Sequence, residues 1–193
     1  MVMIDIGPAA GRMRRLVTSV ADDQLDDPTP CPDMRLGDLL DHVGSLTLAF
    51  TAAARKEGGG RTGPPPEPSA AHLTAGWRER ISHDLAALAA AWQQPDAWDG
   101  FTSAGGIDMP AEVAGLVALD ELVVHGWDIA VASGQPYEPT ESEIDATTSF
   151  VQSFEGPRDG SLFGPVVPVA EAAPPLDRLL GLTGRDPRWQ PSS

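Results

Sequence analysis

Two side chains that could share a metal ion lie four residues apart in this sequence. They are Glu121 and His125, in the segment DELVVHGWD at 120–128. In an α-helix, residues four apart project from the same face, about one turn from each other. A carboxylate and an imidazole placed in this way can bind one divalent ion together. A third protein donor is then expected from another part of the fold.

The third donor predicted from the sequence is His42, in the segment LGDLLDHV at 36–43. Apolar residues recur there at helical spacing, and His42 lies beside the apolar face, so its side chain is expected to point inward or nearly so. Two histidines and one carboxylate leave a coordination position open for water or a substrate atom. Zinc is the first choice for such ligands, and nickel, iron or manganese are the alternatives.

A simpler interpretation of the same residues needs no metal. Glu121 and His125 could form an ordinary surface hydrogen bond, and His42 could be a core histidine with its hydrogen bonds satisfied. The apolar residues around Glu121 favour the metal, since a carboxylate near the inward face is costly unless it is paired or bound. Its neighbour Asp120 is predicted to face solvent. The residues alone leave both interpretations open.

Other reactive side chains are weaker candidates. Asp128 follows His125 by three residues and could orient its imidazole as an outer partner of the metal, or could cap the helix end in solvent. Cys31 precedes the second helix, whose positive end could lower its thiol pKa, but a small residue anchoring the turn is the favoured interpretation. His72 and His83 lie among polar neighbours and are predicted to be solvated.

The elements that must position these residues are helices. Apolar residues at intervals of three and four predict helices over 8–25, 36–54, 71–94, 110–133 and 140–154. The connection at 27–33 contains three prolines and must be extended. The Gly- and Pro-rich stretch 58–68 could be a lid, although a plain surface loop is favoured. Residues 98–110 indicate a long turn with at most a short extended piece.

This order of elements predicts an all-α fold, an antiparallel four-helix bundle with an extra short helix and an irregular C-terminal tail. Bundles of this kind commonly hold metal sites in their interior. The length of 193 residues suits a single domain over 1–193, with the bundle at 1–157 and a covering tail at 158–193. Within the tail, residues 175–182 could form one or two helical turns that cover the bundle.

Composition excludes several classes of partner. Lys and Arg number 13 against 28 Asp and Glu, a net charge of −15, so the chain should repel nucleic acid and anionic lipid. No apolar run of ~18 residues is present to span a membrane, and the start lacks the basic flank of a signal peptide. We therefore expect a cytoplasmic protein, monomeric or homodimeric, whose partner is a small-molecule substrate or thiol. The single cysteine allows neither an internal disulfide nor a thiolate zinc site.

Several segments, taken in order, resemble a known family. The chain is similar to metal-binding proteins of the DinB-like superfamily, in the group related to mycothiol-dependent maleylpyruvate isomerase. The matching segments are 29–42, 120–128, 129–136, 163–165 and 174–180 with 184–187. In two respects the chain departs from the group. Asp33 and Met34 replace a usual Gly-Trp pair, and the separate C-terminal domain of the isomerase is expected to be missing.

The resemblance implies a function as well as a fold. Its metal ligands fall on His42, Glu121 and His125, and it implies a divalent metal that activates a low-molecular-weight thiol such as mycothiol. The implied enzyme is a transferase or isomerase acting on a small electrophilic metabolite, in which a thiol adds, a bond rotates and the thiol leaves. The alternatives are a metal-dependent hydrolase, a non-catalytic metal- or ligand-binding bundle, and a helical interaction module without metal.

Overall fold

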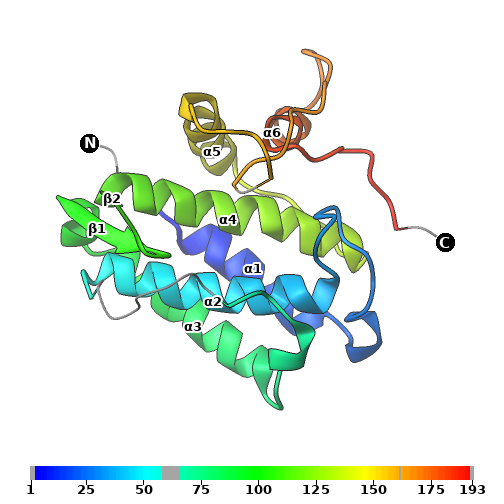
Figure 1. Cartoon of the computed structure of the whole chain (residues 1–193), viewed down its shortest axis with the longest axis horizontal. Helices are drawn as coiled ribbons and strands as arrows, with labels where there is room; N and C mark the ends of the chain where they lie inside the picture. The colour runs from blue at the N-terminus through cyan, green and yellow to red at the C-terminus, as the bar shows by residue number, and fades with distance from the viewer. Residues whose placement is uncertain (1–2, 58–65, 161, 192–193) are drawn as a thin grey trace.

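The computed structural model describes residues 3–57, 66–160 and 162–191. Most of the described chain is helical, and four long helices pack side by side (Figure 1). These helices are α1 (Gly7–Ser19), α2 (Leu36–Ala54), α3 (Trp77–Trp92) and α4 (Ala111–Ala132). The apolar faces predicted from the sequence meet in one core, and the predicted all-α, DinB-like bundle is confirmed.

Contacts between the helices define their directions. Gly44 of α2 lies against Ile81 of α3, and the indole N–H of Trp92 donates to the carbonyl of Phe50 at 3.1 Å. The later residue of α2 contacts the later residue of α3, so α2 and α3 run in the same direction. The α2 and α4 helices are antiparallel. His42 in the first half of α2 meets His125 in the second half of α4. Phe50, near the end of α2, instead lines one pocket with Ala118 in the first half of α4. The bundle therefore contains one crossover connection, between α2 and α3.

The ends of two predicted helices differ from expectation. The first helix ends at Ser19 rather than near 25, and a short 3-10 helix, η1 (Asp22–Gln24), follows it. The third begins at Trp77 rather than near 71, because Gly76 takes a left-handed conformation with φ of 76°. Another 3-10 turn, η2 (Ala70–His72), occupies part of the range predicted to be helical.

The long turn predicted at 98–110 contains a β-hairpin. After the 3-10 helix η3 (Pro95–Trp98), β1 (Phe101–Ala104) pairs with antiparallel β2 (Ile107–Pro110). Gly105 and Gly106 form the connection with φ of 60° and 82°, values that suit the tightest hairpin turns. The hairpin leads directly into α4, the helix that carries Glu121 and His125.

Two further helices cover α4 on the side away from α2 and α3 (Figure 1). They are α5 (Glu141–Ser153) and α6 (Pro175–Thr183). Together with the described residues before, between and after them, 134–160 and 162–191, we call them the C-terminal lobe. The two helices correspond to the helix predicted over 140–154 and to the helical turns predicted over 175–182. The lobe is attached through a buried ion pair, in which Arg12 of α1 donates to both oxygens of Glu143 at 3.2 and 2.6 Å. Tyr137 adds a hydrogen bond from its hydroxyl to the carbonyl of Val123 at 2.6 Å.

Two further predictions concern the Gly- and Pro-rich stretch 58–68 and the absence of a membrane-spanning segment. The first eight residues of the Gly- and Pro-rich stretch, 58–65, lie outside the described residues, and with them the choice between lid and surface loop. Among the helices that are described, none is both long and apolar enough to cross a membrane.

A close approach of two tryptophans to Gly115 generates a stability prediction. A Cβ atom there would lie 2.5 Å from the Trp98 ring and 2.9 Å from Trp92, and both rings are buried. We expect Gly115→Ala to lower the free energy of unfolding by about 1–3 kcal/mol, because an overpacked core must shift. Gly11→Ala is the control, since only Arg15 lies within 4 Å of a Cβ there. Urea unfolding should show a gain of up to ~1 kcal/mol for the control; equal effects in the two variants would contradict this packing.

Candidate metal centre

Helix α4 presents Glu121 and His125 on one face, as their spacing predicted. The Glu121 Oε2 atom lies 3.0 Å from His125 Nε2, and the side chains are 15% and 9% exposed. The helix is apolar on nearly every face, so it is covered by neighbours around most of its circumference. Two groups that could bind metal are therefore held in a largely dehydrated position.

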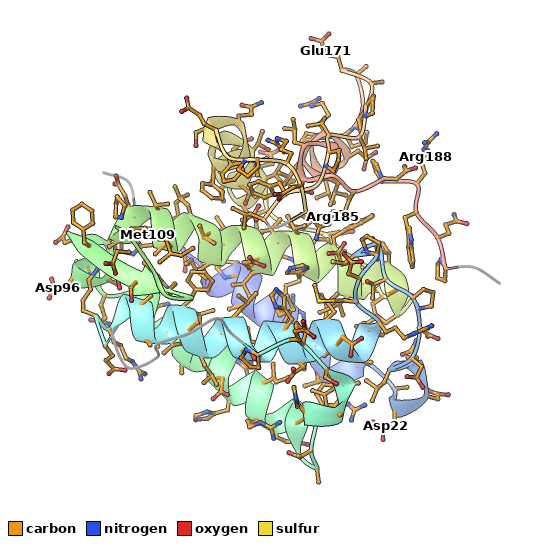
Figure 2. The ribbon with its side chains drawn as sticks, viewed as in Figure 1. Asp22, Asp96, Met109, Glu171, Arg185 and Arg188 are labelled. Atoms are coloured by element: carbon orange, nitrogen blue, oxygen red, sulfur yellow. The ribbon has the colours of Figure 1, made fainter. Side chains whose placement is uncertain are left out.

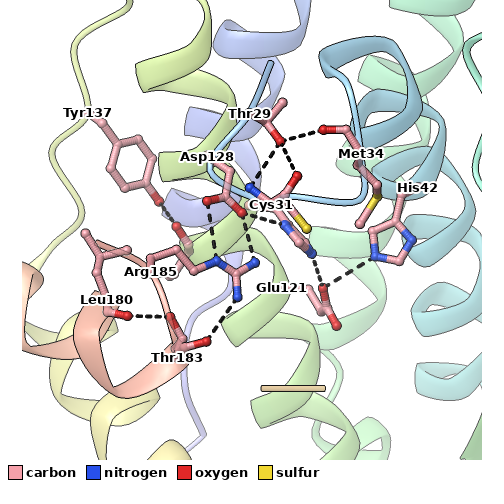
Figure 3. Close-up of polar contacts among 12 residues, drawn as sticks. Thr29, Cys31, Met34, His42, Glu121, Asp128, Tyr137, Leu180, Thr183 and Arg185 are labelled. Carbon is pink, nitrogen blue, oxygen red and sulfur yellow. Dashed lines mark hydrogen bonds and ion pairs between the residues drawn. The ribbon is translucent and has the colours of Figure 1, made fainter. Parts of the chain in front are cut away.

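The third predicted residue, His42, reaches the same point from α2. Its Nε2 atom lies 3.9 Å from Glu121 Oε2, and its ring stands edge-on to that of His125, with centroids 5.1 Å apart. One ligand atom from each of the three side chains falls within 4.8 Å of the other two (Figure 3). With 25% of its side chain exposed, His42 forms the accessible edge of the group.

The three side chains fit a divalent metal ion. Two imidazole nitrogens and one carboxylate oxygen suit zinc, and the same donors suit nickel, iron or manganese. Bonds of ~2.0–2.1 Å at tetrahedral angles place donor atoms about 3.3 Å apart. The two separations from Glu121 Oε2, 3.0 Å to His125 and 3.9 Å to His42, lie on either side of that value, and all three donors lie within 4.8 Å of one another. Among the described residues, this is the one group of three or more His, Cys, Asp or Glu side chains that could hold an ion.

Asp128 determines how His125 is oriented. Its carboxylate is fully buried and lies 3.0 Å from His125 Nδ1, so in the neutral ring Nδ1–H donates to Asp128 and Nε2 is left free on the side of Glu121. That free nitrogen is the atom a metal needs. Complete burial excludes the alternative in which Asp128 caps the helix end in solvent.

Arg185, from the chain segment after α6, also contacts Asp128. Its Nη2 and Nε atoms donate to the two carboxylate oxygens at 3.0 and 3.4 Å (Figure 3). Sequence reasoning included Arg185 only within the matching segment 184–187 and gave it no role. Because 57 residues separate Arg185 from Asp128 and the intervening tail lacks a clear periodicity, no local pattern could reveal the contact.

The charges of the site are coupled. Burial alone would lower the pKa of His125, but its hydrogen bonds with Asp128 and Glu121 outweigh burial and raise it to about 9. Burial also opposes ionisation of Glu121, yet the hydrogen bond and positive charge of His125 bring its pKa below the usual value. Burial and the charge of His125 lower the pKa of His42. Without metal, the site therefore holds a proton on His125.

The structure corrects the prediction that Asp120 faces solvent. Asp120 is only 4% exposed, and burial, followed by the nearby charge of Glu121, raises its pKa to about 8. Its Oδ1 atom is buried without a hydrogen-bond partner among the described residues. The prediction failed because the C-terminal lobe covers the side of α4 that a bundle of four helices would leave in water.

The remaining candidates do not join the three residues of the centre. Burial and the charge of Asp128 raise the pKa of Cys31 to about 11, so its thiol stays protonated at neutral pH. The turn around Cys31 is anchored by Thr29, whose hydroxyl accepts the Cys31 backbone N–H at 3.1 Å (Figure 3). His83 is exposed as predicted, whereas His72 is half exposed and its Nδ1 lies 2.8 Å from a carboxylate oxygen of Asp41.

Comparison with known proteins identifies the family. The profile of the mycothiol maleylpyruvate isomerase N-terminal domain matches residues 6–130, a span that includes α1 to α3, nearly all of α4 and all three candidate ligands. The chain belongs to this family. The C-terminal lobe lies beyond the matched residues, so Asp128 is inside the family domain and Arg185 is outside it.

Two curated proteins are similar to this chain in sequence, and two crystal structures are similar in fold. Two Mycobacterium tuberculosis proteins, both uncharacterized, from strains CDC 1551 / Oshkosh and ATCC 25618 / H37Rv, are 28% identical over 187 residues, which is 90% of this chain and 91% of theirs. Crystal structures of the mycothiol-dependent maleylpyruvate isomerase and a histidine-to-alanine mutant superpose with a TM-score of 0.58 at 16% and 17% identity. The match covers 75% of this chain and 65% of the isomerase, so it shows a shared fold.

The raised pKa of His125 predicts a pH-dependent stability in the metal-free protein. The pKa is about 9 in the fold against 6.5 unfolded, so protonated His125 stabilises the fold fully below pH 6.5. That contribution, on the order of 3 kcal/mol, is lost as pH rises through 9. In the presence of a chelator, the free energy of unfolding of the wild type should fall toward that of His125→Gln as pH rises from 6.5 to 9. A difference that stays constant over this range would contradict the assignment, and His83→Gln should follow the wild type.

Proposed function

We propose that this protein binds one divalent metal ion, zinc in the first instance, through His42, Glu121 and His125, and acts on a small electrophilic metabolite with a low-molecular-weight thiol. The reaction would be a transfer or an isomerisation, and mycothiol is the first thiol to test. One observation carries the proposal: three donors of suitable type, from two helices, converge within 4.8 Å. The family profile, named for a mycothiol enzyme, supports the choice of thiol.

A metal ion held by these residues would supply Lewis acidity, which lowers the pKa of a coordinated thiol or water. The chain's own groups prepare for that ion. Glu121 contributes the single negative charge among the three ligands, and Asp128 keeps the Nε2 atom of His125 free by accepting from Nδ1. Low exposure of Glu121 and His125 limits competing water, which strengthens electrostatic interactions at the site.

A thiol could approach the centre from the side of His42. The apolar pocket beside Glu121 has a volume of only about 10 Å³, roughly one water molecule, and is lined by side chains of α2, α3 and α4. A thiol of the size of mycothiol cannot enter it. His42, with a quarter of its side chain exposed, provides the open edge from which a thiol and its partner could approach.

The test begins with metal content and continues with thiol binding. Purified tag-free protein should contain about one ion per chain, and His42→Ala should lose it, because two donors remain where three are needed. His83→Ala is the matched control, since His83 is exposed and, within the part of the chain that the structure describes, its ring pairs with its neighbour Asp84 alone. Elemental analysis is the measurement; stoichiometric metal retained in a Glu121→Ala plus His125→Ala double variant would refute the site.

The cobalt-substituted protein then tests the thiol. Adding mycothiol should produce a sulfur-to-cobalt charge-transfer band, which His42→Ala should lack. A spectrum unchanged by mycothiol would refute the thiol part of the proposal. In that case hydrolysis of test esters and amides by the zinc form would indicate a hydrolase, and no turnover would indicate a non-catalytic metal-binding bundle.

A further inference from the structure

Arg185 connects the C-terminal lobe to the candidate metal centre. Helix α6 ends at Gly184, which has a φ of 93°, and the next residue, Arg185, turns back toward α4. Figure 2 shows Arg185 between the lobe and α4, whereas Arg188, three residues later, points away from the molecule. The Arg185 side chain is 12% exposed and that of Arg188 is 86% exposed. The burial of Arg185 therefore reflects a specific contact.

Arg185 is mounted rigidly on the end of α6. Its backbone N–H donates to the carbonyl of Leu180 at 2.9 Å, and its Nη1 donates to the carbonyl of Thr183 at 3.3 Å. Helix α6 is in turn tied to the segment before it, where Val167 N–H donates to the Gly181 carbonyl at 2.9 Å. A guanidinium held in this way can transmit the position of the lobe to whatever it touches.

What Arg185 touches is the carboxylate that orients a candidate ligand. Asp128 has no exposed surface, and its two oxygens are used by Arg185 and by His125 Nδ1. If Arg185 were removed, the fully buried Asp128 carboxylate would lose the one of its two partners that is always charged. Such a carboxylate must rotate, take up a proton or disturb its neighbours. In each case the imidazole of His125 would lose its fixed acceptor.

We propose that Arg185 is a positioning residue for metal binding, and that docking of the C-terminal lobe and loading of the metal are coupled through Arg185, Asp128 and His125. The inference rests on the proposed function, since it needs a metal at the centre. It goes beyond that proposal because Arg185 lies outside the residues matched to the family. Arg185 is not a ligand; it acts through Asp128, as outer partners of metal-bound histidines do.

The coupling must be reciprocal. If docking of the lobe increases the affinity for metal by a given factor, metal must favour docking by the same factor. The lobe should therefore become harder to detach when the centre is loaded. This consequence separates coupling from a merely structural role of Arg185, because a structural contact would protect the lobe equally with and without metal.

The first experiment measures zinc affinity by competition with a chromophoric chelator. We expect Arg185→Met to bind zinc about 10–100-fold more weakly than the wild type, and Arg185→Lys to recover part of the loss. Arg188→Met is the matched control, since Asp186 is the one polar partner of Arg188 among the described residues, and it should stay within about twofold of the wild type. An affinity of Arg185→Met within twofold of the wild type would overturn the inference. Failure of the wild type itself to bind zinc would instead refute the proposed function.

A second measurement does not depend on the variant folding. Hydrogen exchange followed by mass spectrometry on the wild type should show slower exchange in 163–187 when zinc is added. The β1–β2 hairpin should be unchanged, because it lies at the other end of α2, where the Thr102 hydroxyl donates to the carbonyl of Ala53. Zinc that binds without slowing exchange in 163–187 would overturn the coupling even if Arg185→Met proved too unstable to purify.

Discussion

Burial of ionisable groups on α4 is the constraint on which the rest of the structure depends. Asp120, His125 and Asp128 are each less than a tenth exposed, and Glu121 is only slightly more so. Charges removed from water are costly unless each finds a partner or, as burial favours for Asp120, the group takes up a proton. The helix provides some partners itself, at spacings of three and four, and the others must come from elements far away in the sequence.

Those distant partners give the surrounding elements their roles. Helix α2 brings His42 to Glu121, and the segment after α6 brings Arg185 to Asp128. A second buried ion pair, between Arg12 of α1 and Glu143 of α5, holds α5 against the bundle. The C-terminal lobe is therefore more than a cover for apolar surface. It completes the charge balance of the helix that carries two of the three candidate ligands.

Much of this arrangement could be predicted from the sequence, because the contacts concerned are local. The spacing of Glu121 and His125 is a property of one helix, and the apolar pattern of 36–54 indicated that His42 points toward the same interior. The hairpin was missed because its strands are four residues each, too short for an alternating pattern, although Gly105 and Gly106 mark its turn.

The features that the sequence did not predict depend on contacts between distant segments. Helix α4 is apolar on nearly every face, so its sequence does not reveal which side meets water, and Asp120 was placed on the wrong side. The pairing of Arg185 with Asp128 depends on the path of a proline-rich tail. Such a path is determined by packing against the bundle, and no periodicity in the sequence records it.

Anomalous diffraction from a crystal of the zinc-loaded protein, recorded on both sides of the zinc absorption edge, tests the central claim most directly. The account predicts one strong peak bonded to Nε2 of His42, a carboxylate oxygen of Glu121 and Nε2 of His125, at about 2.0–2.2 Å from each. A peak elsewhere, for example at His72 and Asp41, or no peak in crystals grown with excess zinc, would contradict it.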